Sequence, residues 1–449
     1  MGQKIDRTYL FERMPVGQAV RRQIIPSIAS QMVILLYNLA DTYFVGLLND
    51  AAQTAAVSLA YSVTLLMTAL ANLFAVGGAG RIAQLLGRRD RDGAREVCAV
   101  SFWFALLASA AFCVLFTLLS SPILRLCGAT DETYALACGY SRWVISVGGT
   151  FSILNTVLAN LIRADGSAFA ASMGVSAGGI INMLLDPLFV LPRFLGMGAE
   201  GAGLATAISN AAGMLILLGI IAARRRVGVV ALRPGDLRAA QRHIGRILRI
   251  GLPSAVQFLL TLVAVGALTK FMSLYDTAAV AALGIVKKLD MLPLYFSIGV
   301  ANGLLPLLAY NYSAENHERR HRIFLCGCAV AVGFSVVCVA GYEVFAPALV
   351  RIFIGDAQTI AYGTKLLRIM VLAMPMMSVC YPMITQFQAM GRMRESLICS
   401  ILRKGSLDIP LLFVLNALFP LYGCAAVQPI VDCICMIVAI YFYKKLPTA

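Results

Sequence analysis

Two aspartates lie inside stretches of sequence that are otherwise apolar enough to cross a lipid bilayer. Asp41 lies in the apolar run 24–48, and Asp186 lies in the run 168–191. An ionised carboxylate is costly in hydrocarbon, so an acidic residue at such a position is by default a candidate for function. Buried carboxylates of this kind can hold a hard cation such as Na⁺, or they can take up and release a proton.

Amide and hydroxyl side chains accompany the two aspartates at helical spacing. Asn182 precedes Asp186 by four residues, which places both side chains on one face of a helix. Helical spacing also relates Thr206 to Asn210, and Gln31 and Asn38 to Asp41. Such oxygens suit a cation, but they can equally do no more than hydrogen-bond neighbouring helices, and the sequence leaves both interpretations open.

The second half of the chain carries basic residues in its apolar runs. Lys270 lies deep in one run, and Lys287 lies with Asp290 in the run 278–309. The spacing of three residues allows Lys287 and Asp290 to form an internal ion pair. Lys287 and its neighbour Lys288 are equally well placed to bind an anionic group of a substrate.

Another aspartate, Asp408, lies near the inner start of the run 397–419, beside Arg403 and Lys404. At the membrane surface this carboxylate would be a charge partner of the two cations. The alternative is that Asp408 takes part in ion coupling.

The composition predicts the solvent in which these charges lie. The chain has 449 residues, of which 60% are hydrophobic and 13% are charged, and its mean hydropathy is +0.82. Soluble globular proteins usually contain about 25% charged residues. Water cannot solvate so much apolar surface, so we expect an all-α integral membrane protein.

Twelve runs are long enough to cross a bilayer, since a spanning helix needs roughly 20 mostly apolar residues. They are 24–48, 52–79, 97–121, 138–162, 168–191, 201–223, 250–273, 278–309, 323–346, 363–389, 397–419 and 423–443. An even number of spans puts both ends of the chain on one side of the membrane.

The basic residues predict which side that is. The sequence has 37 Lys and Arg against 22 Asp and Glu, a net charge of +15. Most of these cations fall on the side of the termini, among them Arg163, Arg403 and the arginines of the segment 224–249. Because basic loops face the cytoplasm, both termini are expected there. Cations spread over every inner loop also argue against nucleic acid as a partner and leave the lipid bilayer as the expected one.

The chain repeats itself at an offset of about half its length. Pro26 and Ser27 open the first run, and Pro253 and Ser254 open the seventh. Two similar halves are typical of transporters, so we expect two pseudo-symmetric lobes of six helices each. The expected parts are an N-terminal lobe at 1–223, a basic cytoplasmic linker at 224–249 and a C-terminal lobe at 250–449.

The motif typical of ATP-driven pumps is absent, because the sequence contains no Walker A motif. ATP is therefore not expected to be the direct source of energy, and the chain is not expected to be an enzyme.

Five short motifs give the chain a resemblance to one transporter family. They are DTYFVG at 41–46, LIRADG at 161–166, NMLLDP at 182–187, GAGLAT at 201–206 and YNYSA at 310–314. In this order and across both halves, they resemble the multidrug and toxic compound extrusion (MATE) family over essentially the whole chain. The resemblance implies two six-helix lobes around a central cavity, and exchange of Na⁺ or H⁺ for organic substrates, often cationic drugs.

The resemblance also implies which residues couple transport to the ion. One branch of the family uses an Asp in helix 1, an Asn and an Asp four apart in helix 5, and a Thr in helix 6. The matching residues here, which would also ligate Na⁺ if sodium is the ion, are Asp41, Asn182, Asp186 and Thr206. Candidates for the substrate cavity are Gln31, Tyr37, Asn38, Asn155, Asn210, Lys270, Lys287 and Met291.

The expected function is secondary active antiport, in which organic, drug-like cations leave the cell in exchange for Na⁺ or H⁺. The expected location is the plasma membrane of a prokaryote, with the protein a monomer and no cofactor beyond the coupling ion. The alternative is a flippase for a lipid-linked precursor, of the same superfamily. That activity would need a basic cavity, and Lys270, Lys287 and Lys288 leave it open.

Overall fold

The computed structural model describes residues 8–48, 50–127, 129–225 and 228–446. Within these ranges the chain forms helices and connecting turns, and no strand. The first half contains η1 (Tyr9–Arg13), α1 (Val16–Gly46), α2 (Ala51–Gly87), α3 (Arg91–Leu126), α4 (Asp131–Ser141), η2 (Arg142–Val147), α5 (Gly149–Ala164), α6 (Ala168–Val190) and α7 (Gly198–Arg224).

The second half has the same character. It contains η3 (Pro234–Ala239), α8 (Ala240–Met272), α9 (Thr277–Ser313), α10 (His317–Arg351), α11 (Ala357–Val371), α12 (Ala373–Ala389), α13 (Met393–Ile401), η4 (Leu402–Ser406), α14 (Asp408–Leu418) and α15 (Tyr422–Lys444). Each of the twelve predicted runs corresponds to one helix or to one series of consecutive helices.

Three spans are interrupted. The helical stretch that ends at Val147 meets α5 at an angle of 45°, and α11 meets α12 at 42°. Pro375, in the first turn of α12, cannot donate a backbone hydrogen bond, and this accounts for the second bend. In the eleventh span, the wide turn η4 separates α13 from α14. The other spans are single helices. Together with these three interrupted spans they make twelve spans in the described part of the chain.

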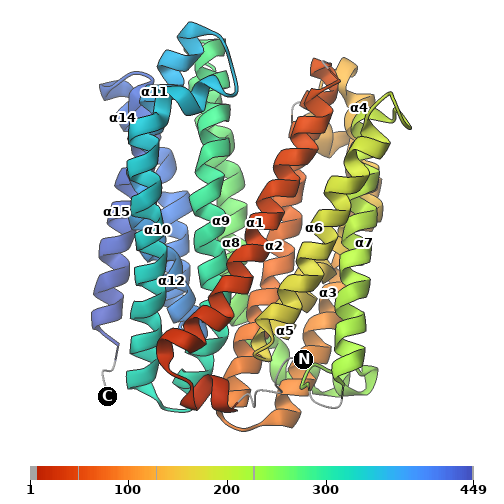
Figure 1. Cartoon of the computed structure of the whole chain (residues 1–449), viewed down its shortest axis with the longest axis vertical. Coiled ribbons are helices and arrows are strands. Elements are labelled where there is room, and N and C mark those ends of the chain that lie inside the picture. The colour runs from red at the N-terminus through yellow and green to blue at the C-terminus, as the bar shows by residue number, and fades with distance from the viewer. Residues whose placement is uncertain (1–7, 49, 128, 226–227, 447–449) are drawn as a thin grey trace.

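The helices form two lobes side by side (Figure 1). One lobe contains α1 to α7, and the other contains α8 to α15. The start of α1 and the end of α15 lie at the same end of the molecule, at the bottom of the view. We call this the inner end, following the predicted orientation, and the opposite end the outer end.

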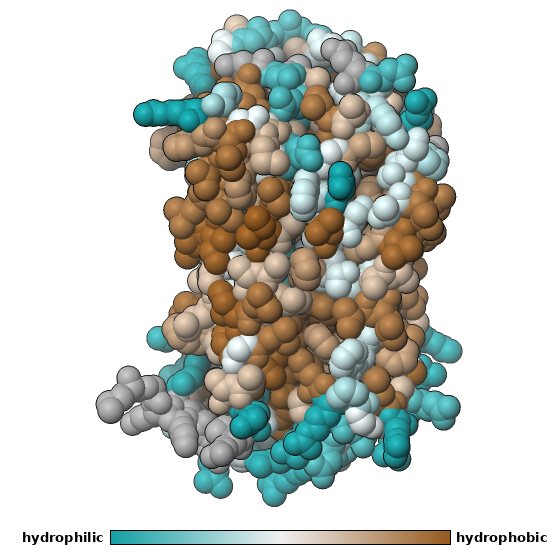
Figure 2. All heavy atoms as spheres, turned by 90° about the vertical axis from the view of Figure 1, so that its right-hand side faces the viewer, coloured by the Kyte–Doolittle hydropathy of each residue, from teal (hydrophilic) through white to brown (hydrophobic). Residues whose placement is uncertain are grey.

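A band of apolar side chains surrounds the middle of the molecule. Figure 2 shows hydrophobic residues gathered over the waist of one face, with hydrophilic residues at both ends. Large side chains such as Leu118, Leu184 and Leu215 are exposed on α3, α6 and α7. Exposed leucines on consecutive helices are what a hydrocarbon solvent favours, so the surface agrees with a multi-pass membrane protein.

The two lobes touch backbone to backbone near the inner end. A Cβ atom added to Gly299 of α9 would lie 2.7 Å from the Cα of Ile28 on α1. At Gly303, one turn further on, it would lie 2.8 Å from the carbonyl oxygen of Gln23. Small residues four apart let two helices approach closely in a membrane, so these glycines form a seam between the lobes.

A second glycine pair extends this seam. Gly77 of α2 lies against the backbone of Ile247 on α8, and Gly251 of α8 lies against the backbone of Leu73 on α2. Neither position has room for a side chain. The lobes are therefore held together at the inner end by helix backbones, with no large side chain between them at these points.

The seam predicts a position-specific effect of added volume. In Gly303→Val the new side chain meets the α1 backbone, and such overpacking costs about 1–3 kcal/mol. We expect the melting temperature of the purified protein to fall by several degrees. Gly284→Val on the same helix is the matched control, because a Cβ at Gly284 meets nothing within 4 Å. Equal melting temperatures for the two variants would contradict the seam.

Candidate functional site

The N-terminal lobe brings an amide, a carboxylate and a hydroxyl group together around α6. Asn182 donates from its Nδ2 to the Oδ1 of Asp186 at 3.4 Å and to the Oγ1 of Thr206 on α7 at 3.3 Å. Asn182 and Asp186 are fully buried. The four-residue spacing read from the sequence thus places these side chains on one face, and α7 supplies the third group.

The other aspartate reaches the same region from α1. The hydroxyl of Tyr140, on α4, donates to the Oδ2 of Asp41 at 3.3 Å. Asp41 is 8% exposed, and the packing of α1 against Gly179 of α6 brings the helix segments that carry Asp41 and Asp186 side by side. Four helices, α1, α4, α6 and α7, therefore converge on one polar cluster, which we call the N-lobe cluster: Asp41, Tyr140, Asn182, Asp186 and Thr206.

Close packing of α1 on α6 makes this convergence possible. A Cβ atom on Gly179 would lie 2.6 Å from the Cγ1 of Val33 and 3.1 Å from the ring of Tyr37. Because a β-branched side chain such as that of Val33 is stiff, no larger residue fits at Gly179 without moving α1. Gly179 thus lets α1 lie against α6 one to two turns before Asp41 and Asp186.

Three oxygens of the N-lobe cluster are buried without a hydrogen-bond partner among the residues that the structure describes. They are the Oδ1 of Asp41, the Oδ1 of Asn182 and the Oδ2 of Asp186. A buried acceptor without a donor costs about 1–3 kcal/mol, and more when it is charged. Carboxylate and amide oxygens are ligands of hard cations, and carboxylates also accept protons. The arrangement therefore fits either Na⁺ or H⁺.

Two of the candidate substrate residues extend from this cluster. Asn155 on α5 donates to the Oδ1 of Asn210 on α7 at 3.4 Å, and Asn210 donates to the carbonyl oxygen of Thr206 at 3.0 Å. Together with Thr206, they make a chain of polar groups that runs from α5 to the N-lobe cluster.

Other candidates on α1 lie towards the second lobe. Asn38 donates to the hydroxyl of Tyr295 on α9 at 3.4 Å, which is a direct polar contact between the lobes. Tyr37 lies against Gly179. Gln31 and Met291 are half-buried on α1 and α9.

The basic candidates of the C-terminal lobe do not lie together. Lys287 lines a cavity with Lys404, Asp408 and Gln428. The prediction that Lys270 lies deep in its span was wrong. It is exposed and only two residues from the end of α8, where a long side chain can reach the membrane surface.

Of the two interpretations left open for Lys287, the ion pair with Asp290 is not formed in the part of the chain that the structure describes, where no nitrogen–oxygen contact within 4.0 Å joins them. Lys287 instead borders the cavity together with residues of α14 and α15, on the side of the lobe that those helices form. The three-residue spacing was therefore not enough to pair these two side chains.

Two further positions need correction. Arg403 was assigned to an inner loop and Asp408 to the inner start of its span. In the structure α13 precedes both, so they lie in the middle of the span, and Arg403 is 1% exposed. Arg403 instead donates from its Nε to the Oδ1 of Asp432 on α15 at 2.8 Å, and its guanidinium lies 4.4 Å from the ring centre of Tyr381.

The sequence interpretation missed three residues of these clusters. Asp432 lies within the predicted span 423–443, so the rule that singled out Asp41 and Asp186 would have found it. Tyr140 and Tyr295 carry no comparable signal, because tyrosines are frequent in membrane helices and their partners lie far away in the sequence.

The YNYSA motif at the end of α9 binds η1, the short helical segment that precedes α1. The hydroxyl of Tyr310 donates to the Oε1 of Glu12 at 2.8 Å, and its ring stacks on that of Phe11 at 4.7 Å. Arg319 on α10 donates to the carbonyl oxygens of Phe11 and Met14 at 2.8 Å and 2.6 Å. The segment η1, which leads into the N-terminal lobe, is thus fastened to the C-terminal lobe at the inner end.

Comparison with known proteins gives one consistent result. A family model described as MatE matches residues 26–188 and 253–414. The chain is 29% identical over 437 residues to the multidrug export protein MepA of Staphylococcus aureus (strain NCTC 8325 / PS 47), covering 97% of this chain and 95% of that protein. MepA of Staphylococcus saprophyticus is 27% identical over 436 residues, with the same coverage.

Solved structures agree in fold. An outward-facing multidrug resistance MATE family transporter of the MOP superfamily has a TM-score of 0.91 at 24% identity, over 98% of both chains. A MOP superfamily transporter from Pyrococcus furiosus, described as having a binding pocket of reverse polarity that suggests a different function, has a TM-score of 0.91 at 25% identity. That match covers 99% of this chain and 98% of the other.

The buried Arg403–Asp432 pair predicts an asymmetric mutational response. Arg403→Met leaves the Asp432 carboxylate uncompensated, and breaking a buried pair from one side costs about 3–5 kcal/mol. We expect the yield of folded protein and its melting temperature to fall sharply. The double variant Arg403→Met with Asp432→Leu removes both charges and should recover most of the loss. A double variant less stable than Arg403→Met alone would refute this account of the pair.

Proposed function

Because the chain belongs to the MatE family of membrane transporters, we propose that it exports organic, drug-like molecules in exchange for Na⁺ or H⁺ bound at the N-lobe cluster. The protein is a multi-pass membrane transporter, not an enzyme. Two considerations support the finer proposal. Relatives that match nearly its whole length are named multidrug export proteins, and the N-lobe cluster has the chemistry of an ion site.

One observation carries the proposal of ion coupling. The oxygens of Asp41, Asn182 and Asp186 that lack hydrogen-bond partners belong to two different helices, α1 and α6. An ion shared by these oxygens would draw the helices together, whereas two unneutralised carboxylates repel each other. Binding at this site therefore changes the preferred position of α1.

The proposed cycle follows from that preference. With the ion bound from outside, α1 packs closely on α6 and the substrate is released. With the ion discharged inside, α1 relaxes, and the central space can receive substrate again. Coupling requires that the ion and the substrate favour different arrangements of the lobes. Each ligand can shift the equilibrium between these arrangements only by the difference between its affinities for them.

Asp41 and Asp186 would carry the charge change, with Asn182 and Thr206 as neutral ligands. Tyr140 would hold the Asp41 carboxylate in place through its hydroxyl. The polar chain of Asn155 and Asn210 would contact the substrate from the N-terminal lobe. Organic cations are the proposed substrates, because uncompensated carboxylate oxygens favour positive charge.

The membrane setting is proposed on the same basis. The plasma membrane of a prokaryote is the proposed location, since the named relatives are staphylococcal proteins. Basic residues concentrate at the inner end, where α1 begins and α15 ends, so that end would face the cytoplasm. We propose that a single chain is the transporting unit. A flippase for a lipid-linked precursor is not favoured, because the curated relatives are named for multidrug export.

Neutralising Asp41 tests the proposal directly. In proteoliposomes, we expect Asp41→Asn to abolish gradient-driven transport of ethidium while the protein remains inserted. Imposing Na⁺ and H⁺ gradients separately on the wild type names the coupling ion. Asp50→Asn is the matched control, since Asp50 caps α2 nine residues further on and Asn is an equally good cap. Wild-type rates in Asp41→Asn would sink the proposal.

Tyr140→Phe tests the role of the tyrosine. Losing a hydrogen bond to a carboxylate removes about 1.5 kcal/mol or more of stabilisation from the ion-free site. We therefore expect the ion concentration for half-maximal transport to fall about tenfold. The control is Tyr134→Phe on the same helix, which keeps a ring beside Arg125. A higher half-maximal concentration in Tyr140→Phe would mean that the hydroxyl ligates the ion instead.

A further inference from the structure

The segment η1 lies between the two lobes at the inner end of the molecule. Leu10 and Phe11 are 3% and 0% exposed, although η1 has only five residues. On the side of the N-terminal lobe, a Cβ atom on Gly166 would lie 3.1 Å from the Cδ2 of Leu10 and 3.1 Å from the Cε2 of Phe11. On the other side, Tyr310 of α9 and Arg319 of α10 contact η1 from the C-terminal lobe. The segment therefore touches both lobes at once.

The two sides of η1 differ in chemistry. Its contact with the N-terminal lobe is apolar packing, whereas its contact with the C-terminal lobe is mainly hydrogen bonding. A helix this short leaves its last carbonyl oxygens without donors of its own, and the carbonyl oxygen of Phe11 accepts from the Nε of Arg319 at 2.8 Å and from the Nδ2 of Asn311 at 3.3 Å. Hydrogen bonds at the inner surface exchange for bonds to water at a smaller net cost than apolar packing is broken. The C-terminal lobe is therefore the side from which η1 can separate.

The segment η1 is fixed to the base of α1. Only Met14 and Pro15 lie between them, and proline restricts the backbone at this junction. Arg319 also donates to the carbonyl oxygen of Met14, at 2.6 Å. Any movement of the C-terminal lobe away from the base of α1 must consequently break the bonds that Arg319 makes.

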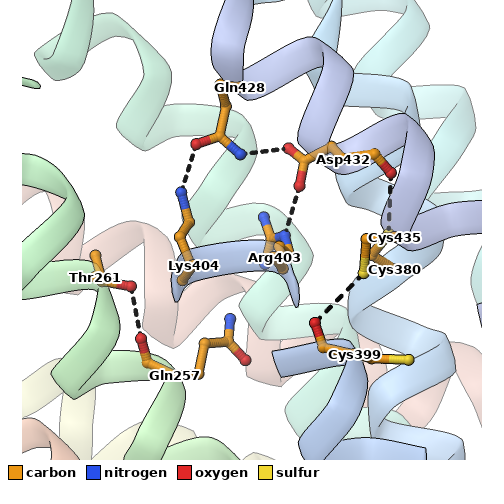
Figure 3. Close-up of polar contacts among 9 residues, drawn as sticks. All are labelled: Gln257, Thr261, Cys380, Cys399, Arg403, Lys404, Gln428, Asp432 and Cys435. Atoms are coloured by element: carbon orange, nitrogen blue, oxygen red, sulfur yellow. Dashed lines mark hydrogen bonds and ion pairs between the residues drawn. The ribbon is translucent and has the colours of Figure 1, made fainter. Parts of the chain in front are cut away.

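Polar contacts tie the C-terminal lobe together (Figure 3). Lys404 of η4 donates to the Oε1 of Gln428 on α15 at 2.6 Å, and Gln428 donates to the Oδ2 of Asp432 at 2.8 Å. Arg403 of η4 donates to the other oxygen of this carboxylate, and the Sγ of Cys380 on α12 donates to the carbonyl oxygen of Asp432 at 3.7 Å. Because α12, η4 and α15 are joined in this way, we expect opening at the inner end to part the two lobes and not to divide this one.

The glycine seam lies between η1 and the outer contact of the lobes. Along α1, the seam at Gln23 lies between η1 and Asn38. Along α9, the seam at Gly303 lies between Tyr310, which binds η1, and Tyr295, which binds Asn38. If the lobes rock about the seam, separation at η1 brings them together at the outer end.

From these contacts we propose that η1 is a clasp that holds the inner end closed, and that its release from α9 and α10 is a required step in opening towards the cytoplasm. The bonds from Arg319 to the η1 carbonyl oxygens, and the bond from Tyr310 to Glu12, then set the balance between the outward-open and inward-open arrangements. A weaker clasp favours the inward-open arrangement. This inference rests on the proposed export cycle, in which the lobes alternate, but not on the identity of the ion or of the substrate.

Removing the guanidinium of Arg319 tests the clasp. Arg319→Gln loses the hydrogen bonds to the carbonyl oxygens of Phe11 and Met14. A hydrogen bond from a charged donor changes an equilibrium by about tenfold or more, so we expect the ratio of inward-open to outward-open molecules to rise at least about tenfold. Arg322→Gln is the matched control, because Arg322 lies on the same helix and pairs with Glu318 of that helix.

Distances between spin labels distinguish the two arrangements in the full-length protein in lipid nanodiscs. The labels are attached to p-acetylphenylalanine, since the chain has 12 cysteines of its own. One pair spans the inner end, at the exposed positions Asp92 of α3 and Arg394 of α13, and another spans the outer end, at the exposed positions Asp131 of α4 and Ala357 of α11. In the variant we expect the inner distance to lengthen and the outer distance to shorten in the same fraction of molecules.

A milder variant keeps the test decisive if the first one folds poorly. Tyr310→Phe loses the hydroxyl that donates to Glu12 but keeps the ring that stacks on Phe11. We expect the same opposite changes at the two ends, with the ratio of the two arrangements raised about threefold or more. Tyr312→Phe in the same motif is the matched control, because it keeps the ring that lies beside Arg320.

Unchanged distances at both ends in both variants would overturn the inference. A longer inner distance without a shorter outer distance would also overturn it, because loss of η1 structure alone affects only the inner end. These measurements need neither an ion gradient nor a substrate. Failure of ethidium transport under both gradients would instead reject the proposed function, while the distances would still decide whether η1 is a clasp.

Discussion

The cost of an unpaired charge in hydrocarbon governs this structure. Most ionisable groups within the helices have a partner: Arg403 pairs with Asp432, and Arg163 donates to the hydroxyl of Ser30. Pairing is incomplete in the N-lobe cluster, where, among the described residues, one side-chain oxygen each of Asp41, Asn182 and Asp186 lacks a donor. A transporter with such a site has a place for a cation.

The twelve spans were predictable because the bilayer imposes its thickness on the sequence directly. Each apolar run became a helix or a helix series, although most helices extend further than the runs; α8, for example, begins at Ala240 and not at residue 250. Charged ends such as this one lower the local hydropathy while the backbone remains helical. The interruptions at η2 and η4 were not predictable, because wide helical turns depend on packing by distant segments. The division into parts at 1–223, 224–249 and 250–449 stays a prediction.

The polar clusters were predictable only where both partners lie on one helix. Asn182 and Asp186 are four residues apart, so periodicity alone places them together. Asp41 and Tyr140 are 99 residues apart, and no pattern in the sequence links them. Arg403 was misplaced for a different reason: with Lys404 it depresses the hydropathy, so the middle of a span looked like its edge. The pairing with Asp432 that lets this arginine lie in the lobe is itself a long-range contact.

Helix α1 joins these separate features. It carries Asp41 in the N-lobe cluster, contacts Tyr295 of the other lobe through Asn38, and lies against Gly299 and Gly303 at the inner seam. At Asn38 a side-chain hydrogen bond joins α1 to α9, whereas at the seam the helix backbones meet, so we expect the seam to be the stiffer of the two contacts and the pivot. An ion that pulls Asp41 towards α6 would therefore move the outer part of α1 about a fixed inner point. Because Asn38 lies one turn before Asp41 and donates to Tyr295, that movement would reach α9.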